Sequence, residues 1–164
     1  MKAIGQLEAK VQWNRSRSKN SADFYTVGYS LYSPTDLLHA LREAGVHTLV
    51  DIRHDAISMH RPEFSKSNLR HFLGTYGVAY IHCPDLGVPR DVRLRVTRDS
   101  NRDIVWRWYD SHVVPSFAGR NLDRFFNCAD HPIALMCVEA DPSSCHRHRL
   151  AIALEHHGLR SYDL

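Results

Sequence analysis

The sequence contains no long hydrophobic run. Its longest uninterrupted apolar stretch, PIALMCV at residues 132–138, is far too short to cross a lipid bilayer. The N-terminus also lacks the apolar segment of a secretory signal. We therefore expect a cytoplasmic protein without a membrane partner, whose four cysteines are reduced and serve in packing, metal binding or catalysis rather than in disulfides.

A strong charge imbalance is missing as well, and so are internal repeats. The 164 residues carry a formal net charge of +3, which permits an anionic partner without requiring one. With 43% hydrophobic and 24% charged residues, the composition is that of a globular protein. The length suffices for one domain with a full hydrophobic core.

The first 23 residues differ in composition from the rest. They end in the polar, basic and turn-rich stretch NRSRSKNSAD, which predicts a flexible basic N-terminal tail over residues 1–23. The compact part begins at FYTVGYS. We therefore expect a single α/β domain over residues 24–164.

Strand-like and helix-like segments alternate along that domain. Short apolar runs predict strands, and helical periodicity with capping residues predicts helices. The predicted strands are residues 24–27, 47–53, 78–84, 131–139 and 159–164. The predicted helices are residues 34–44, 65–76, 101–112, 117–128 and 142–157, with a loop over residues 85–99. This order predicts a three-layer α/β domain with a mainly parallel sheet flanked by helices.

Polar side chains gather where the predicted strands end. The strands run into Gly-Tyr-Ser at residues 28–30, Asp-Ile-Arg at 51–53, His-Cys-Pro at 82–84 and Cys-Val-Glu at 137–139. In parallel sheets, ligands bind outside the carboxyl ends of the strands. We expect the functional site at this edge of the sheet.

The stretch CVEADPSSCHRHR, residues 137–149, holds the densest set of reactive side chains. It leads into the last predicted helix, whose apolar stripe includes Leu150 and Leu154. Residues three and four positions before Leu150 share that face, so His146 and Arg147 should point inward. Cys145 lies in the first turn beside basic side chains, which favours its thiolate form.

Three kinds of chemistry remain open for this stretch. A bound metal, zinc or iron, would take Cys137, Cys145 and His146 as ligands, but their spacing matches no familiar zinc motif and a metal is not favoured. A phosphatase-type cysteine loop fails, because Ser143 stands where the arginine after Cys137 is needed. A reactive thiol at Cys145 and a phosphate-binding helix start both remain possible.

Arginines near the strand ends are candidates for binding an anion. Arg53, Arg61 and Arg147, together with Ser30, could hold a phosphate, since the planar guanidinium fits it well. A second set of arginines crowds residues 90–102, either as a solvated loop or as an edge that contacts phosphates. The catalytic candidates that would act on the bound group are His146, His82, Glu139, Asp51 and Cys145.

The sequence resembles the domain-of-unknown-function family 488 (DUF488). The resemblance is carried by TVGYS, VDIR, RPEF, YIHCPDLG and LMCVEADPSSCHR, and spans roughly residues 25–157. It implies a compact α/β domain with an enzyme-like pocket, and a link to nucleotide or nucleic-acid processing. Arg61, His54-Asp55 and Cys83 depart from the family pattern. The residues that match it are Gly28, Ser30, Asp51, Arg53, Pro62, Phe64, Tyr80, His82, Leu86, Gly87, Cys137, Glu139, Pro142, Cys145, His146 and Arg147.

The main hypothesis is an enzyme with a phosphate pocket, acting as a hydrolase or transferase on a nucleotide or nucleic acid. One alternative is a thiol- or metal-dependent protein that uses Cys145. Another is a nucleic-acid-binding module without catalysis, which would use the basic tail and residues 90–102. The lack of aromatic side chains in that stretch speaks against stacking on single strands.

Overall fold

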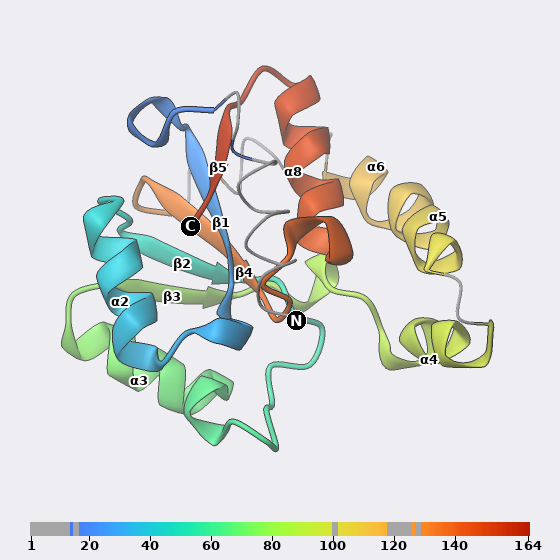
Figure 1. Ribbon diagram of the computed structural model, residues 1–164, viewed down its shortest axis with the longest axis horizontal. Helices are drawn as coiled ribbons and strands as arrows, with labels where there is room; N and C mark the ends of the chain where they lie inside the picture. Colours follow the sequence, from blue (N-terminus) through green and yellow to red (C-terminus); the bar gives the residue numbers. More distant parts are fainter. Residues whose placement is uncertain (1–13, 15–16, 100–101, 118–125, 127–128) are drawn as a thin grey trace.

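A parallel sheet forms the centre of the protein. The computed structural model describes residues 14, 17–99, 102–117, 126 and 129–164. Its five strands are all parallel and lie in the order β3-β2-β4-β1-β5 (Figure 1). They are β1 (Phe24–Gly28), β2 (Thr48–Asp51), β3 (Ala79–His82), β4 (Ile133–Cys137) and β5 (Ser161–Asp163). The α/β fold and all five predicted strands are confirmed.

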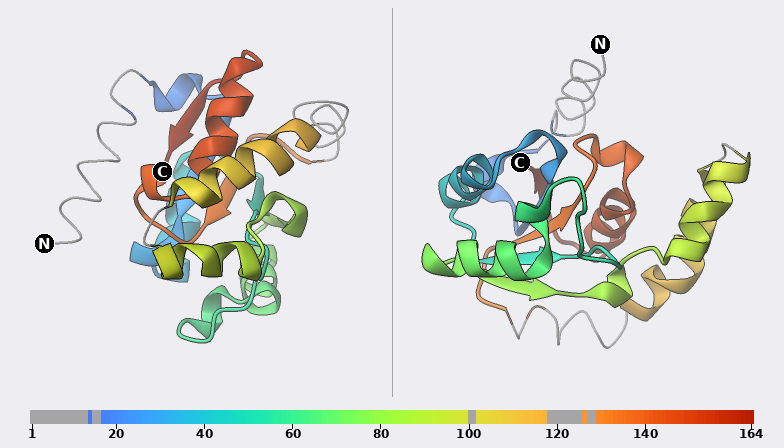
Figure 2. Two further views of the ribbon diagram at one scale, coloured as in Figure 1. Left: turned by 90° about the vertical axis from the view of Figure 1, so that its right-hand side faces the viewer. Right: turned by 90° about the horizontal axis from the view of Figure 1, so that it is seen from below.

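Helices cover both faces of the sheet, which explains why its central strands are apolar throughout. One face packs against α2 (Pro34–Glu43) and α3 (Lys66–Thr75). The other packs against α5 (Asp103–His112), α6 (Val114–Phe117) and α8 (His146–His156) (Figures 1 and 2). Every residue of β1, β2 and β4 is buried, as expected for strands with both faces covered.

The turn chemistry read from the sequence explains the ends of α2. The Ser33 side chain accepts a hydrogen bond from the backbone of Asp36, and the Asp36 side chain accepts one from the backbone of Ser33. Pro34 occupies the first turn, and Gly45 follows the helix with a φ of 68°. This reciprocal cap satisfies donors that the helix start leaves unpaired.

The strand register aligns the carboxyl ends that should carry the site. Gly28 of β1 pairs with Cys137 of β4, and Asp51 of β2 pairs with Met136. On its other side, Asp51 pairs with His82 of β3. The polar segments that follow β1, β2, β3 and β4 therefore leave the sheet at one edge.

The segment expected to be a loop is largely helical. Helix α4 (Arg90–Asp99) runs through it and packs against α5 away from the sheet (Figure 2). Val88 and Val92 are buried in the same core cluster as Val105 and Tyr109 of α5. The loop prediction was wrong because the many arginines outweighed this small apolar face, which is enough to dock a helix on a neighbour.

The last two predicted helices need separate comment. Predicted helix 117–128 lies mostly outside the described residues. The final helix starts later than expected, because Pro142–Ser144 forms a 3₁₀ turn and Cys145 is extended. No helix in the described part of the chain has both the length and the hydropathy to cross a membrane.

Part of the predicted N-terminal tail contacts the domain. Arg17 pairs with Glu155 of α8 at 2.9 Å, and the Asn14 side chain donates to the Asp163 carbonyl at 2.8 Å. Lys19–Ser21 forms a 3₁₀ turn whose Lys19 carbonyl accepts from the Tyr25 hydroxyl. Residues 1–13, 15 and 16 lie outside the described residues.

Candidate active site

The loop between β4 and α8 brings together residues that are apart in the sequence. β4 ends at Cys137, and the chain then turns back through the 3₁₀ segment 142–144. The Asp141 carboxylate caps that segment by accepting from the Ser143 backbone at 2.9 Å. Cys145 follows with extended backbone, φ −130° and ψ 145°, as the N-cap of α8. The helix start therefore lies beside the end of β4.

Two thiols and an imidazole meet at this point. Potential ligand atoms of Cys137, Cys145 and His146 all lie within 4.8 Å of one another. The Cys137 sulfur is 3.7 Å from His146 Nδ1 and 3.6 Å from Glu139 Oε2. Both cysteines are buried, with 3% and 2% of their surface exposed. We refer to Cys137, Cys145 and His146 as the thiol–imidazole cluster.

The neighbouring strand β2 fixes the His146 ring. Nε2 lies 3.1 Å from the Ile52 carbonyl oxygen. A carbonyl oxygen can only accept, so Nε2 carries the proton and, in the neutral ring, Nδ1 carries the lone pair. The Tyr109 ring, with its centroid 5.3 Å from that of His146, covers the imidazole on the α5 side.

The ionisable groups of the site shift one another. Burial disfavours a thiolate at Cys145, but the Cys137 thiol, His146 and Arg147 outweigh burial and hold the pKa of Cys145 well below its usual value. The contact with Cys145, together with burial, raises the pKa of Cys137. Burial, followed by the negative charge of Cys145, raises the pKa of Glu139 to about 7. Burial opposes the imidazolium form of His146, yet the Cys145 charge raises its pKa overall.

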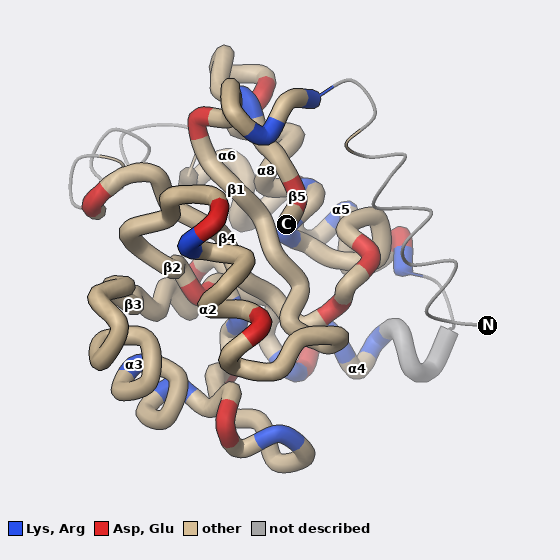
Figure 3. The backbone as a smooth tube through the Cα atoms, turned by 60° about the vertical axis from the view of Figure 1, so that its left-hand side comes forward, with Lys and Arg blue, Asp and Glu red and all other residues tan. Residues whose placement is uncertain are grey.

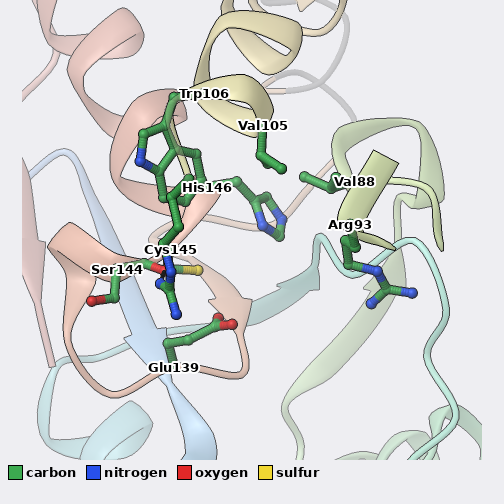
Figure 4. Close-up of a pocket in the computed structure, with 9 residues that line it drawn as sticks. Val88, Arg93, Val105, Trp106, Glu139, Ser144, Cys145 and His146 are labelled. Atoms are coloured by element: carbon green, nitrogen blue, oxygen red, sulfur yellow. Dashed lines mark hydrogen bonds between the residues drawn. The ribbon is translucent and has the colours of Figure 1, made fainter. Parts of the chain in front are cut away.

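Cys145 and His146 of the cluster lie at the floor of a pocket. This pocket has a volume of about 170 Å³ and lies between the start of α8 and the pair α4 and α5. The Cys145 sulfur, the His146 ring and the Glu139 carboxylate face it (Figure 4). Its lining residues are Val88, Arg93, Arg102, Val105, Trp106, Glu139, Ser144, Cys145 and His146.

Two arginines stand at the rim of this pocket. Arg93 belongs to α4, along which basic residues recur (Figure 3), and pairs with Asp55 at 2.6 Å. Arg102 precedes α5 and donates to the Ser144 carbonyl at 2.6 Å. Both lie in the arginine-rich stretch noted in the sequence, but neither was among the predicted site residues. The spacing of Val88 and Val92 is the signal that could have placed Arg93 on a helix facing the site.

Residues 33–154 match the family model described as domain of unknown function DUF488. The chain belongs to this family. The matched range contains the thiol–imidazole cluster, Glu139 and both rim arginines. No curated protein and no solved structure matches the chain.

In this DUF488 protein, Arg147 does not line the pocket. It is fully buried, and its guanidinium lies 3.2 Å from the Asp163 carboxylate. It also donates to the Ala140 carbonyl at 3.0 Å and to the Glu139 carbonyl. Arg147 therefore holds the loop after β4 against β5. Its guanidinium contacts these protein groups rather than the pocket in which an anion was expected.

Arg53 and Asp51 form a second buried pair. Arg53 is 4% exposed and bonds both carboxylate oxygens of Asp51, at 2.9 and 2.5 Å. It also donates to the Phe64 carbonyl at 2.9 Å and the Tyr29 hydroxyl at 3.1 Å. The Tyr80 hydroxyl donates to Asp51 at 2.5 Å. Neither residue lines the pocket, and their bonds join β2 and β3 to the loop at Phe64.

The other predicted site residues also lie away from the cluster. Arg61 donates to the carbonyls of Tyr29, at 3.1 Å, and Tyr32, at 2.5 Å, and so holds the turn after β1. Ser30 is exposed, and His82 Nε2 donates to the Arg53 carbonyl at 2.8 Å. Of the predicted residues, the structure gathers Cys137, Glu139, Cys145 and His146 into one site.

Proposed function

We propose that this DUF488 protein is an enzyme that acts on a small phosphate-bearing substrate, such as a nucleotide, in the pocket at the start of α8. The observation that carries the proposal is the convergence of Cys145, His146 and Glu139 on a pocket whose rim holds Arg93 and Arg102. Reactive groups at the floor and cations at the rim suit a substrate with an anionic end and a reacting centre next to it.

The rim arginines are the groups that would hold the phosphate. A guanidinium has five N–H donors in a planar fork that matches phosphate oxygens. Arg93 uses part of this capacity on Asp55, and Arg102 uses part on the Ser144 carbonyl. Both side chains lie at the surface of the pocket, so a bound phosphate would not need to displace a buried partner.

The reaction would take place at the floor. The Glu139 carboxylate faces the pocket and lies 3.6 Å from the Cys137 sulfur, where it could pass a proton to or from the substrate. Cys145 supplies the sulfur that lines the pocket beside it. A hydrolase or transferase reaction fits this arrangement, with the phosphate as the group by which the protein binds the substrate.

The size of the pocket favours a small substrate. A volume of about 170 Å³ encloses a phosphate and the atoms next to it, while the rest of the substrate would lie across α4 and α5. Arg90 and Arg95 are exposed on α4 and could contact further phosphates of a nucleic acid. Binding of an oligonucleotide more tightly than of its mononucleotide, with a steep salt dependence, would assign the substrate to that class instead.

The test is the binding of inorganic phosphate and of a nucleoside monophosphate, measured by calorimetry. We expect Arg102→Ala and Arg93→Ala each to weaken binding about tenfold, because a charge-assisted hydrogen bond is removed. Arg95→Ala is the matched control, since Arg95 lies on the same helix but does not line the pocket. Equal affinity in all three variants, or no binding to the unaltered protein, would overturn the proposal.

A further inference from the structure

The thiol–imidazole cluster has the geometry of a metal site. In tetrahedral zinc sites, Zn–S is about 2.3 Å and Zn–N about 2.0–2.1 Å, so a sulfur and a nitrogen ligand lie about 3.6 Å apart. The Cys137 sulfur and His146 Nδ1 are separated by 3.7 Å. The Cys145 sulfur completes a set whose atoms all lie within 4.8 Å of one another. Three ligands can therefore surround one ion once the imidazole turns a nitrogen toward the sulfurs.

The orientation of His146 supports ligation independently of these distances. Histidines that bind metals commonly donate their second ring N–H to a carbonyl or carboxylate, which fixes the tautomer and aims the lone pair. His146 Nε2 donates to the Ile52 carbonyl at 3.1 Å, so Nδ1 keeps the lone pair, and the Cys137 sulfur lies 3.7 Å from Nδ1 and 3.8 Å from Nε2. The Ile52 carbonyl thus leaves Nδ1 as the ligating nitrogen, and a turn of the ring would aim its lone pair between the two sulfurs.

Charge and burial also suit a dication. Two thiolates and a neutral imidazole around a divalent ion sum to zero net charge, which lowers the cost of burying the set. Cys137 lies at the strand end, whereas Cys145 and His146 line the pocket. A fourth tetrahedral position would therefore face the pocket, as in zinc sites that keep one position for water or substrate.

We propose that Cys137, Cys145 and His146 bind one Zn²⁺ with an open coordination position toward the pocket. This deepens the proposed function, on which it rests only for the role of the ion next to the substrate. The ion would polarise a substrate oxygen or a bound water, and Glu139 is placed beside it to exchange a proton. The residues come from the end of β4 and the start of α8, which the 3₁₀ turn between them brings together.

The experiment uses the full chain, reduced, stripped of metal with a chelator and then freed of the chelator. Zn²⁺ is titrated in competition with a chromophoric chelator, and Co²⁺ is added to a separate sample as a spectroscopic probe. We expect one equivalent of Zn²⁺ per chain. The Co²⁺ form should show thiolate-to-cobalt charge transfer and the visible bands of a tetrahedral site.

Single substitutions identify the ligands. We expect Cys137→Ser, Cys145→Ser and His146→Ala each to weaken Zn²⁺ binding by more than about 100-fold, since even partners outside the ligand set contribute about 10–100-fold. Cys83→Ser is the matched control, because Cys83 follows β3 at the same edge of the sheet but lies outside the cluster. Its affinity for Zn²⁺ should equal that of the unaltered protein.

The unaltered protein alone can overturn the proposal, which matters if a variant does not fold. Absence of a charge-transfer band with Co²⁺, or Zn²⁺ binding no tighter than that of the unfolded chain, would exclude the site. So would an equal loss of affinity in Cys83→Ser. Zinc binding is measured without substrate and phosphate binding through Arg102, so failure of one proposal is distinguishable from failure of the other.

Discussion

The arginines inside the domain differ from those at the pocket rim in what their guanidinium groups contact. Arg53 and Arg147 are 4% and 0% exposed, and each is paired with a buried aspartate and with backbone carbonyls. Arg93 and Arg102 lie at the surface, where they bond the Asp55 carboxylate and the Ser144 carbonyl, each at 2.6 Å. The sequence favoured Arg53 and Arg147 as anion-binding residues, because Arg53 lies at the end of a predicted strand and Arg147 lies near the start of a predicted helix.

Position at a strand end does not by itself leave the guanidinium group of an arginine free to bind an anion. A guanidinium enclosed by carbonyls and a carboxylate cannot take up a ligand without leaving those groups unpaired. The interior arginines instead shape the site, because Arg147 holds the loop that carries Glu139. Substitution of an interior arginine should therefore lower stability, and substitution of a rim arginine should weaken phosphate binding.

The largest effect should come from Arg147→Ala. Removing the guanidinium leaves the Asp163 carboxylate buried with one fewer partner, and the Glu139 and Ala140 carbonyls lose their donor. Breaking a buried ion pair typically costs about 3–5 kcal/mol, so we expect a loss of that size in the free energy of unfolding. Urea denaturation followed by circular dichroism measures it.

A matched control for this variant is Arg95→Ala. Arg95 forms an exposed pair with Asp91 one turn away, 3.7 Å apart. Such pairs contribute about 0.3–0.5 kcal/mol. The comparison between interior and rim arginines breaks if Arg147→Ala keeps the stability of the parent protein and loses only phosphate binding.

A smaller effect is expected from Gly28→Ala, which tests how tightly Arg147 and the Glu139 backbone pack on β1. A Cβ at this position would overlap the Glu139 carbonyl oxygen and lie 2.9 Å from Arg147 Nη1. Backbone cannot yield as a flexible side chain does, so we expect a loss of about 1–3 kcal/mol in unfolding free energy. The shift of Glu139 should also alter phosphate binding.

Gly74→Ala provides the contrast for Gly28→Ala. Gly74 lies in α3, and a Cβ there meets no atom within 4 Å. Alanine favours a helix over glycine by up to about 1 kcal/mol, so this variant should be equally or more stable. If both variants lost the same unfolding free energy, the close approach of the Glu139 backbone to Gly28 would not be the reason that a side chain at residue 28 is unfavourable.

Much of the fold could be predicted from the sequence. For the site, the sequence predicted only which side chains face inward. The apolar runs and the Ser33 cap predict the strands and α2, because these are local signals. The stripe through Leu150 and Leu154 correctly turns His146 and Arg147 inward. It cannot say how deep each side chain reaches, and Arg147 passes beyond the pocket to Asp163 on β5. Asp163 belongs to β5, which lies at the edge of the sheet beside β1.

The cluster itself could not be read from spacing. Cys137 and Cys145 approach each other because the chain between them turns through Pro142–Ser144 and Cys145 is extended. Several loop shapes were compatible with the same residues. The rim arginines were hidden for a different reason, since the helix that carries Arg93 has only a small apolar face, which packs against α5 and is outnumbered by arginines.

The smallest effect should come from an exposed pair of the same residue types, Asp23 and Arg160. Hydrogen bonds from Arg160 lower the pKa of Asp23, although slight burial opposes them. A carboxyl group with a lowered folded-state pKa adds stability above its unfolded pKa of about 4 and loses it as pH falls through the lowered value. Asp23→Asn should therefore unfold slightly more easily than the parent protein at pH 7, and the two urea midpoints should converge in acid. Added salt should shrink the difference at pH 7, since Arg160 is exposed and Asp23 is only partly buried. A difference that persists in acid and in salt, or one as large as that of Arg147→Ala, would mean that enclosure is not what separates the strong arginine pairs of this protein from the weak ones.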